Sequence, residues 1–284
     1  MNIGITGMPT DQTMPPTELA RACEERGFES LFLPDHSHIP VSRRSPWPGS
    51  LSGEALPEAY GRLPDPFVAL AAAAAATTTL RVGTSVCLVA QRDVLQLAKE
   101  VATLDWLSGG RFVFGVGMGW NAEEMADHGV AFPDRWDIVA EKLDALKVLW
   151  RDEVASYAGT HVRFEGCWAW PKPAQRPHPP ILLGGGWGPR LLEAVCRHAD
   201  GWLPISSRRT LAERIALLHG AAARLGRDPA TLQITVTNAR PDLSVLRTLE
   251  DEGVSRAMLL VEMDDRDALL RQLDAHAPLA AALG

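Results

Sequence analysis

Short apolar runs alternate along the chain with longer stretches in which apolar residues recur every three or four positions. The short runs predict β-strands and the longer stretches predict amphipathic helices. The expected strands span residues 2–6, 30–34, 80–89, 111–117, 181–183, 201–205, 232–236 and 257–261. The expected helices span residues 17–26, 66–77, 94–104, 134–150, 189–198, 211–225, 243–252 and 266–277. Thr17 is the expected N-cap of the first helix.

Each predicted strand is followed by a predicted helix, so the chain contains eight strand–helix units. Alternation of this kind implies a parallel sheet with helices outside it. Eight units in one chain predict a (β/α)8 TIM barrel. An open doubly wound sheet is the alternative, but it favours a glycine-rich turn after the first strand, and residues 7–12 read GMPTDQ. No linker divides the chain, so we expect a single domain over residues 1–284.

Two segments interrupt the alternation. Residues 36–64 are rich in proline, glycine and serine and are too long for a plain connection, which indicates an excursion over a site. Residues 154–178 contain aromatic residues and prolines and predict a hairpin or an irregular insertion.

Composition narrows the classes of function. The chain has 284 residues, of which 46% are hydrophobic and 22% charged, which is typical of a globular protein. Its formal net charge of −7 argues against a dedicated nucleic-acid partner. The four cysteines lie far apart, so we expect neither a metal site nor a disulfide framework, but reduced thiols in a cytoplasmic protein. No apolar run approaches the ~20 residues that a membrane span requires.

In a barrel, functional groups lie where strands end. Asp35 and His36 follow the second predicted strand, and an imidazole beside a carboxylate can exchange a proton near neutral pH. The same pair could merely cap a loop. The fourth strand leads into Gly117, Met118, Gly119 and Trp120. Alternating glycines bring backbone N–H groups close to a planar or phosphorylated ligand, although a tight turn would use them equally well.

The later strands end in groups suited to anions. Gly184, Gly185 and Gly186 precede a predicted helix, where backbone amides can approach a ligand. Ser206, Ser207 and Arg208 stand at another helix start and form a candidate phosphate cradle. An ordinary serine cap with solvated arginines is the alternative. Four tryptophans in expected top-face loops could wall an aromatic pocket: Trp120, Trp168, Trp170 and Trp187.

Several motifs together resemble a known family. They are LFLPDH (31–36), RVGTSV (81–86), LAKEVATLDWLSGGRFVFGVGMGW (97–120), LKVLW (146–150), PPILLGGG (179–186) and HADGW (198–202). They are similar to those of the luciferase-like flavin/deazaflavin oxidoreductases, and within these to the probable F420-dependent group. The resemblance implies the same barrel and a flavin or deazaflavin on its top face.

The resemblance also implies roles for individual residues. His36 is the expected catalytic residue, and Asp35 is expected to contact the cofactor ring. A non-proline cis peptide between Ser85 and Val86 is expected to back the ring. The loops from Gly117 to Trp120 and from Gly184 to Gly186 would contact the cofactor, and the group Ser206, Ser207 and Arg208 would hold its phosphate.

The expected function is hydride transfer between coenzyme F420 and a small organic substrate. An FMN-dependent monooxygenase that uses O₂ is the alternative, and a non-enzymatic cofactor-binding protein is a third. Trp120 stands where sugar-phosphate dehydrogenases of the family carry an acidic residue, which argues against that substrate class. The resemblance is compatible with a homodimer.

Overall fold

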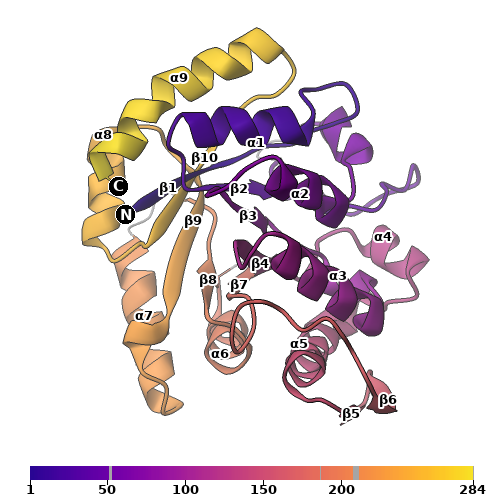
Figure 1. Cartoon of the computed structure of the whole chain (residues 1–284). Helices are drawn as coiled ribbons and strands as arrows, with labels where there is room; N and C mark the ends of the chain where they lie inside the picture. The colour runs from indigo at the N-terminus through magenta and orange to yellow at the C-terminus, as the bar shows by residue number, and fades with distance from the viewer. Residues whose placement is uncertain (51–52, 186, 207–210, 284) are drawn as a thin grey trace.

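The computed structural model describes residues 1–50, 53–185, 187–206 and 211–283. Its centre is a closed barrel of parallel strands in the order β1-β10-β9-β8-β7-β4-β3-β2 (Figure 1). The barrel strands are β1 (Asn2–Thr6), β2 (Ser30–Leu33), β3 (Arg81–Thr84), β4 (Phe112–Val116), β7 (Ile181–Gly184), β8 (Gly201–Leu203), β9 (Gln233–Ala239) and β10 (Arg256–Leu260). The predicted (β/α)8 barrel is therefore confirmed.

In the described part of the chain, each barrel strand is followed by a helix of the outer layer (Figure 1). These helices are α1 (Pro16–Glu25), α2 (Pro66–Ala75), α3 (Val94–Leu107), α5 (Arg135–Arg151), α6 (Pro189–His198), α7 (Leu211–Arg224), α8 (Leu243–Asp251) and α9 (Arg266–Leu283). The prediction that Thr17 caps α1 is wrong, because Pro15 is the N-cap and Pro16 occupies the first turn, where its missing N–H costs nothing. The helix α9 continues past its predicted end and contains Pro278.

Strand β3 is shorter than predicted. It ends at Thr84, and Val89–Gln91 form a 3-10 turn, η2. The apolar residues between them belong to the loop that connects β3 to α3. The error arose because a buried loop and a buried strand have the same apolar composition.

Two elements lie outside the eightfold repeat. The hairpin of β5 (Ala155–Ala158) and β6 (Arg163–Cys167) confirms the predicted insertion. Its turn is held on α5, where Glu141 accepts the amide hydrogen of Val162 at 2.6 Å. The hairpin connects the end of α5 to the start of β7, so it lies away from the strand ends that form a barrel's site. Trp168 and Trp170 follow β6 there, and their predicted place in a top-face pocket is wrong.

The second additional element is the short helix α4 (Ala122–Asp127), which the pattern analysis missed. Asn121 caps it by accepting the amide hydrogen of Glu124 through its side chain at 3.3 Å. Six residues are too few to show a helical period. The capping pattern of an asparagine followed by glutamate three residues later was the available signal.

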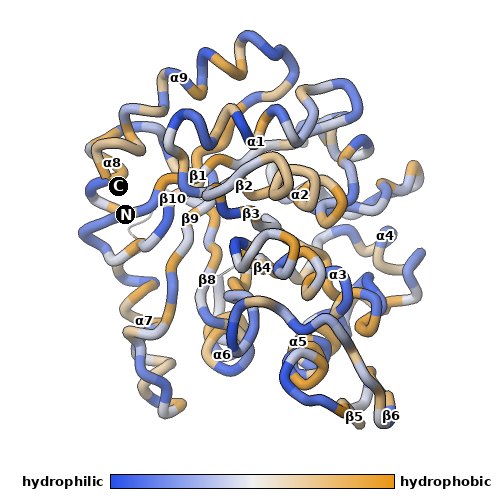
Figure 2. Tube along the Cα trace, viewed as in Figure 1, coloured by the Kyte–Doolittle hydropathy of each residue, from blue (hydrophilic) through white to orange (hydrophobic). Residues whose placement is uncertain are grey.

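Apolar side chains form two layers. A small cluster fills the barrel interior: Phe32, Val113, Leu182, Leu203 and Met258. A much larger cluster lies between the strands and the helices. Figure 2 shows outer helices such as α1 and α9 changing repeatedly between hydrophobic and hydrophilic residues, as expected for helices that cover a barrel on one face, whereas α2 is apolar along almost its whole length. The interior cluster closes the barrel, and the chemistry must therefore lie at its ends.

Two findings concern the composition. All four cysteines are free, and three of them, Cys23, Cys87 and Cys196, are buried. In the ranges that the structure describes, no helix has the length and apolar character needed to cross a lipid bilayer.

Candidate active site

His36 follows β2 at the mouth of the barrel and is almost fully buried. Its Nδ1 lies 2.7 Å from Oε2 of Glu124, whose side chain is fully buried. The other carboxylate oxygen of Glu124 accepts the amide hydrogen of Ser37 at 3.2 Å. For Nε2 of His36, no hydrogen-bond partner is recorded within the described residues. The ring is therefore anchored at one nitrogen and can serve a substrate with the other.

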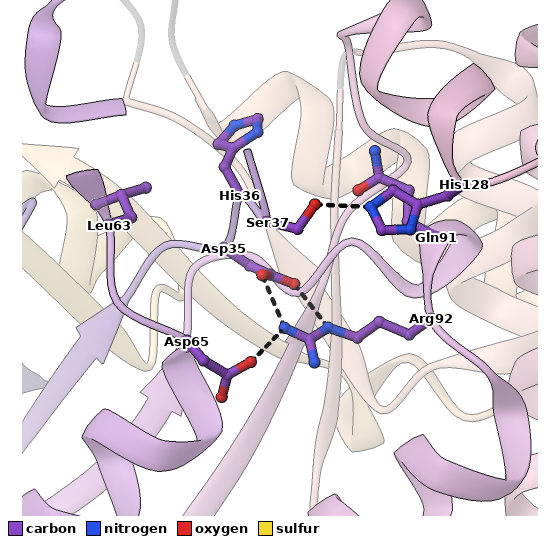
Figure 3. A pocket seen from close by; sticks show the side chains of 8 residues that line it. All are labelled: Asp35, His36, Ser37, Leu63, Asp65, Gln91, Arg92 and His128. Carbon is purple, nitrogen blue, oxygen red and sulfur yellow. Dashed lines mark hydrogen bonds and ion pairs between the residues drawn. The ribbon is translucent and has the colours of Figure 1, made fainter. Parts of the chain in front are cut away.

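Asp35 does not pair with the neighbouring imidazole. Figure 3 shows that its carboxylate points away from His36 and toward Arg92. Arg92 donates to both oxygens, from Nε at 3.0 Å and from Nη2 at 2.9 Å, and the amide of Leu88 donates to Oδ2 at 3.0 Å. Burial lowers the pKa of Arg92, but the hydrogen bond to Asp35 contributes to a larger opposing effect, so its pKa is raised and it stays charged.

This carboxylate holds the loop after β3 against the end of β2. Cys87 in that loop is fully buried, and burial and the charge of Asp35 raise the pKa of its thiol. Cys87 is therefore an uncharged thiol at neutral pH. Contact of Asp35 with a cofactor stays a prediction.

A cavity of about 280 Å³ opens beside His36 (Figure 3). It is lined by Asp35, His36, Ser37, Leu63, Asp65, Gln91, Arg92 and His128. The hydroxyl of Ser37 lies 2.6 Å from Nε2 of His128 and 2.9 Å from Nδ1 of His38. Asp127, the last residue of α4, lies 2.9 Å from Nε2 of His38. The segment from His36 to His38 is thus fastened to α4 at three successive residues.

Aromatic rings cover the imidazole of His36. The ring centroids of Tyr60 and Trp120 lie 5.4 Å and 5.7 Å from that of His36, and 6.3 Å from each other. Tyr60 belongs to the 36–64 segment, and Trp47 in the same segment donates to its hydroxyl at 3.0 Å. The predicted excursion over a site is therefore observed in its described part, and Trp120 does contribute to an aromatic wall.

The other wall of the mouth is built around Val86. The peptide bond between Ser85 and Val86 is cis, as the resemblance implies. A Cβ atom on Gly117 would lie 2.2 Å from Cγ2 of Val86, and one on Gly184 would lie 3.0 Å from its Cγ1. Both positions admit only glycine without displacement, because the valine side chain fills the space. These glycines thus let three strand ends meet in a closely packed surface.

Among the described residues at the mouth, two apolar side chains are exposed. Leu260 ends β10 two residues after Met258 of the interior cluster, and Ile205 stands two residues after Leu203 of the same cluster. Side chains two residues apart lie on the same side of a strand, so both point inward. They are 51% and 64% exposed. A planar apolar group is the kind of ligand that would cover them.

The structure describes some of the remaining predicted site residues, and others lie outside the described ranges. Met118 is buried, and Gly119 and Gly185 continue the loops after β4 and β7. The amide of Ser206 donates to the carbonyl of Thr237 at 2.8 Å. Gly186, Ser207 and Arg208 lie outside the described residues, so the phosphate cradle stays a prediction.

Prediction from the sequence missed the side chains on and next to α4 that contact the segment after β2. Glu124, Asp127 and His128 all meet the segment after β2, and Arg92 neutralises Asp35. Their pairing depends on contacts between residues more than fifty positions apart. Within the described part of the chain, no group of three or more histidine, cysteine or acidic side chains could hold a metal ion.

Comparison with known proteins identifies the family. A model described as luciferase-like monooxygenase matches residues 8–241. The chain belongs to the luciferase-like monooxygenase family. An uncharacterised protein of Mycobacterium tuberculosis (strain ATCC 25618 / H37Rv) is 38% identical over 268 residues, which cover 94% of each chain. The F420-dependent hydroxymycolic acid dehydrogenase of that strain is 27% identical over 216 residues, which cover 75% of this chain and 55% of the dehydrogenase.

Solved structures share the luciferase-like barrel. A monooxygenase from Streptomyces bottropensis superposes with a TM-score of 0.81 and 21% identity, covering 99% of each chain. An F420-dependent secondary alcohol dehydrogenase, solved with an F420–acetone adduct, superposes with a TM-score of 0.76 and 16% identity, covering 98% of each chain. Likenesses at this level of identity concern the fold, so the reaction must be argued from the site.

Proposed function

We propose that this protein is an F420-dependent oxidoreductase that transfers a hydride between the deazaflavin and a small organic substrate. The observation that carries the proposal is His36, buried at the end of β2 with one ring nitrogen anchored and the other without a recorded partner in the described residues. A single poised proton donor or acceptor suits alcohol–carbonyl interconversion, in which a proton leaves or joins oxygen as hydride leaves or joins carbon.

The proposed site of the deazaflavin ring is the mouth of the barrel. Val86 packed between Gly117 and Gly184 forms one wall, and Leu260 and Ile205 supply exposed apolar surface. When bound there, F420 would supply the hydride donor or acceptor. The residues of this chain would orient the substrate, exclude water and move the proton at Nε2 of His36.

Relatives and chemistry favour F420 over FMN. A hydroxymycolic acid dehydrogenase among the sequence relatives is named F420-dependent. His36 offers the acid–base group that alcohol or carbonyl chemistry requires. The aromatic rings of Tyr60 and Trp120 favour a substrate with apolar or planar groups.

Titration of the purified protein with F420 and, separately, with FMN tests the cofactor, with fluorescence as the readout. We expect saturable binding of F420 and no binding of FMN. Leu260→Asp places a charge on the apolar surface and should weaken F420 binding at least tenfold. Leu217→Asp, on the outer helix α7 and 56% exposed, is the matched control and should bind normally. Tight binding of FMN alone would replace the proposal with an FMN-dependent monooxygenase.

A further inference from the structure

We infer that Glu124 is a positioning residue that keeps a proton on Nδ1 of His36 and so reserves Nε2 for the substrate. The role of His36 in turnover rests on the proposed function, whereas the protonation of its ring does not. The contact is short, at 2.7 Å between Nδ1 and Oε2, and the Glu124 side chain is fully buried. A buried carboxylate without such a partner would be costly.

The orientation of this carboxylate is set by a second donor. The amide N–H of Ser37 can only donate, and it donates to Oε1 of Glu124 at 3.2 Å. The second oxygen then faces Nδ1. Because an imidazole is a stronger base than a carboxylate, the shared proton belongs on Nδ1. Nε2 is then an acceptor in the neutral ring and a donor in the charged ring.

The aromatic rings around His36 do not determine which nitrogen carries the proton. Tyr60 and Trp120 meet the imidazole in tilted and edge contacts, which exclude water without fixing a tautomer. Within the described residues, the only hydrogen bond of the His36 ring is the one between its Nδ1 and the carboxylate of Glu124. That carboxylate therefore decides which nitrogen carries the proton.

The neighbouring residue Glu123 provides a matched control. It faces the 36–64 segment instead of His36, accepting the amide hydrogen of Arg44 at 2.8 Å and the hydroxyl hydrogen of Ser45 at 2.6 Å. Glu123 and Glu124 have the same chemistry and occupy the same turn of α4. They differ in what they hold.

Replacement of Glu124 by glutamine should reverse the tautomer. The Ser37 amide still requires an acceptor, so the carbonyl oxygen of the glutamine takes the place of Oε1. The amide nitrogen then faces Nδ1 and donates to it. The ring must accept at Nδ1 and carry its proton on Nε2, which removes the acceptor that the proposed reaction uses.

The experiment is NMR of the protein labelled with ¹⁵N-histidine, with the signals of His36 assigned by their loss in His36→Asn. In the wild type, Nδ1 should carry a proton across the whole range from pH about 6 to about 9, in either charge state. In Glu124→Gln, the neutral ring should carry its proton on Nε2. Glu123→Gln should keep the wild-type pattern. In turnover assays, Glu124→Gln should lower kcat about a hundredfold with little change in KM.

An unprotonated Nδ1 in the wild type would overturn the inference and needs no variant that might fail to fold. An unchanged tautomer in Glu124→Gln would do the same, as would equal effects of the Glu123 and Glu124 variants on the ring. If F420 fails to bind, the proposed function fails, while the NMR result still decides the role of Glu124.

Discussion

The two ends of the barrel each contain a carboxylate paired with a nitrogen base, but the pairs differ in what they leave free. At the floor, where the strands begin, Arg256 donates to Glu29 from Nε at 2.7 Å and from Nη2 at 2.6 Å. At the mouth, Glu124 contacts only one nitrogen of His36. The floor pair saturates both oxygens of Glu29, whereas the mouth pair leaves a titratable nitrogen without a recorded partner in the described residues.

The charge states of the two pairs differ in the same way. Burial acts to raise the pKa of Glu29, but the hydrogen bonds and charge of Arg256, together with Arg81, lower it overall. Arg81 lies 3.6 Å from the same carboxylate. Glu29 is therefore held charged and cannot exchange protons near neutral pH. A fully paired ion pair contributes to stability, and a half-paired imidazole can do chemistry.

The largest expected effect is on turnover at the mouth. His36→Asn retains a donor that can reach Glu124 but has no titratable ring. We expect kcat to fall by at least about a hundredfold, because general acid–base catalysis contributes on that scale. F420 binding, measured by fluorescence titration, should persist. Near-normal turnover in this variant would remove His36 from the catalytic role.

Next in size is the loss of the ion pair at the floor. Arg256→Met leaves Glu29 without its bidentate partner, and the arginine side chain is only 7% exposed in the native protein. We expect the free energy of unfolding to fall by about 2 kcal/mol, less than for a fully buried pair, because Glu29 reaches solvent. Urea unfolding measures this loss, and turnover should be unaffected. A stability equal to that of the wild type would show that the floor pair contributes nothing.

A smaller effect is expected where the mouth is packed by Val86. In Gly117→Ala, the new methyl group collides with Val86, and overpacking of this kind typically costs about 1 to 2 kcal/mol. The double variant with Val86→Ala should recover part of that loss in urea unfolding. Additive losses in the double variant would mean that Val86 is not the reason for the glycine.

The barrel was predictable because its signal is local. Strands buried on both faces appear as short apolar runs, and the helices between them repeat every three or four residues. The one helix cap that was predicted, Thr17, was wrong, because Pro15 takes that position. The identity of His36 as a candidate also followed from its place directly after a strand.

The partners of His36 were not predictable in the same way. Glu124 lies 88 positions from His36, on a helix of six residues that shows no periodic pattern. Asp35, adjacent to His36 in sequence, suggested itself as the partner, yet successive side chains at a strand end point in opposite directions. The pairing of Asp35 with Arg92 and of His36 with Glu124 is a consequence of three-dimensional packing.

The smallest expected effect is a pH-dependent change in stability at the floor of the barrel. Partial burial acts to raise the pKa of Glu24, but hydrogen bonds from the backbone of Thr79, Leu80 and Thr78 outweigh it and lower the pKa from 4.5 to about 2. A carboxyl group whose pKa is lowered on folding contributes stability that is present above pH 4.5 and is lost as the pH falls toward 2.

Urea unfolding of Glu24→Gln should therefore show a loss that is largest above pH 4.5 and shrinks as the pH falls toward 2. The loss should stay below about 1 kcal/mol, because Glu24 is partly exposed and solvent screens its charge. Glu25→Gln, an exposed neighbour on α1, is the control and should show no such dependence. A loss in Glu24→Gln that is constant with pH would mean that shape, and not charge, holds the loop before β3. The floor would then be stabilised by packing, and the contrast with the mouth would rest on the Glu29 pair alone.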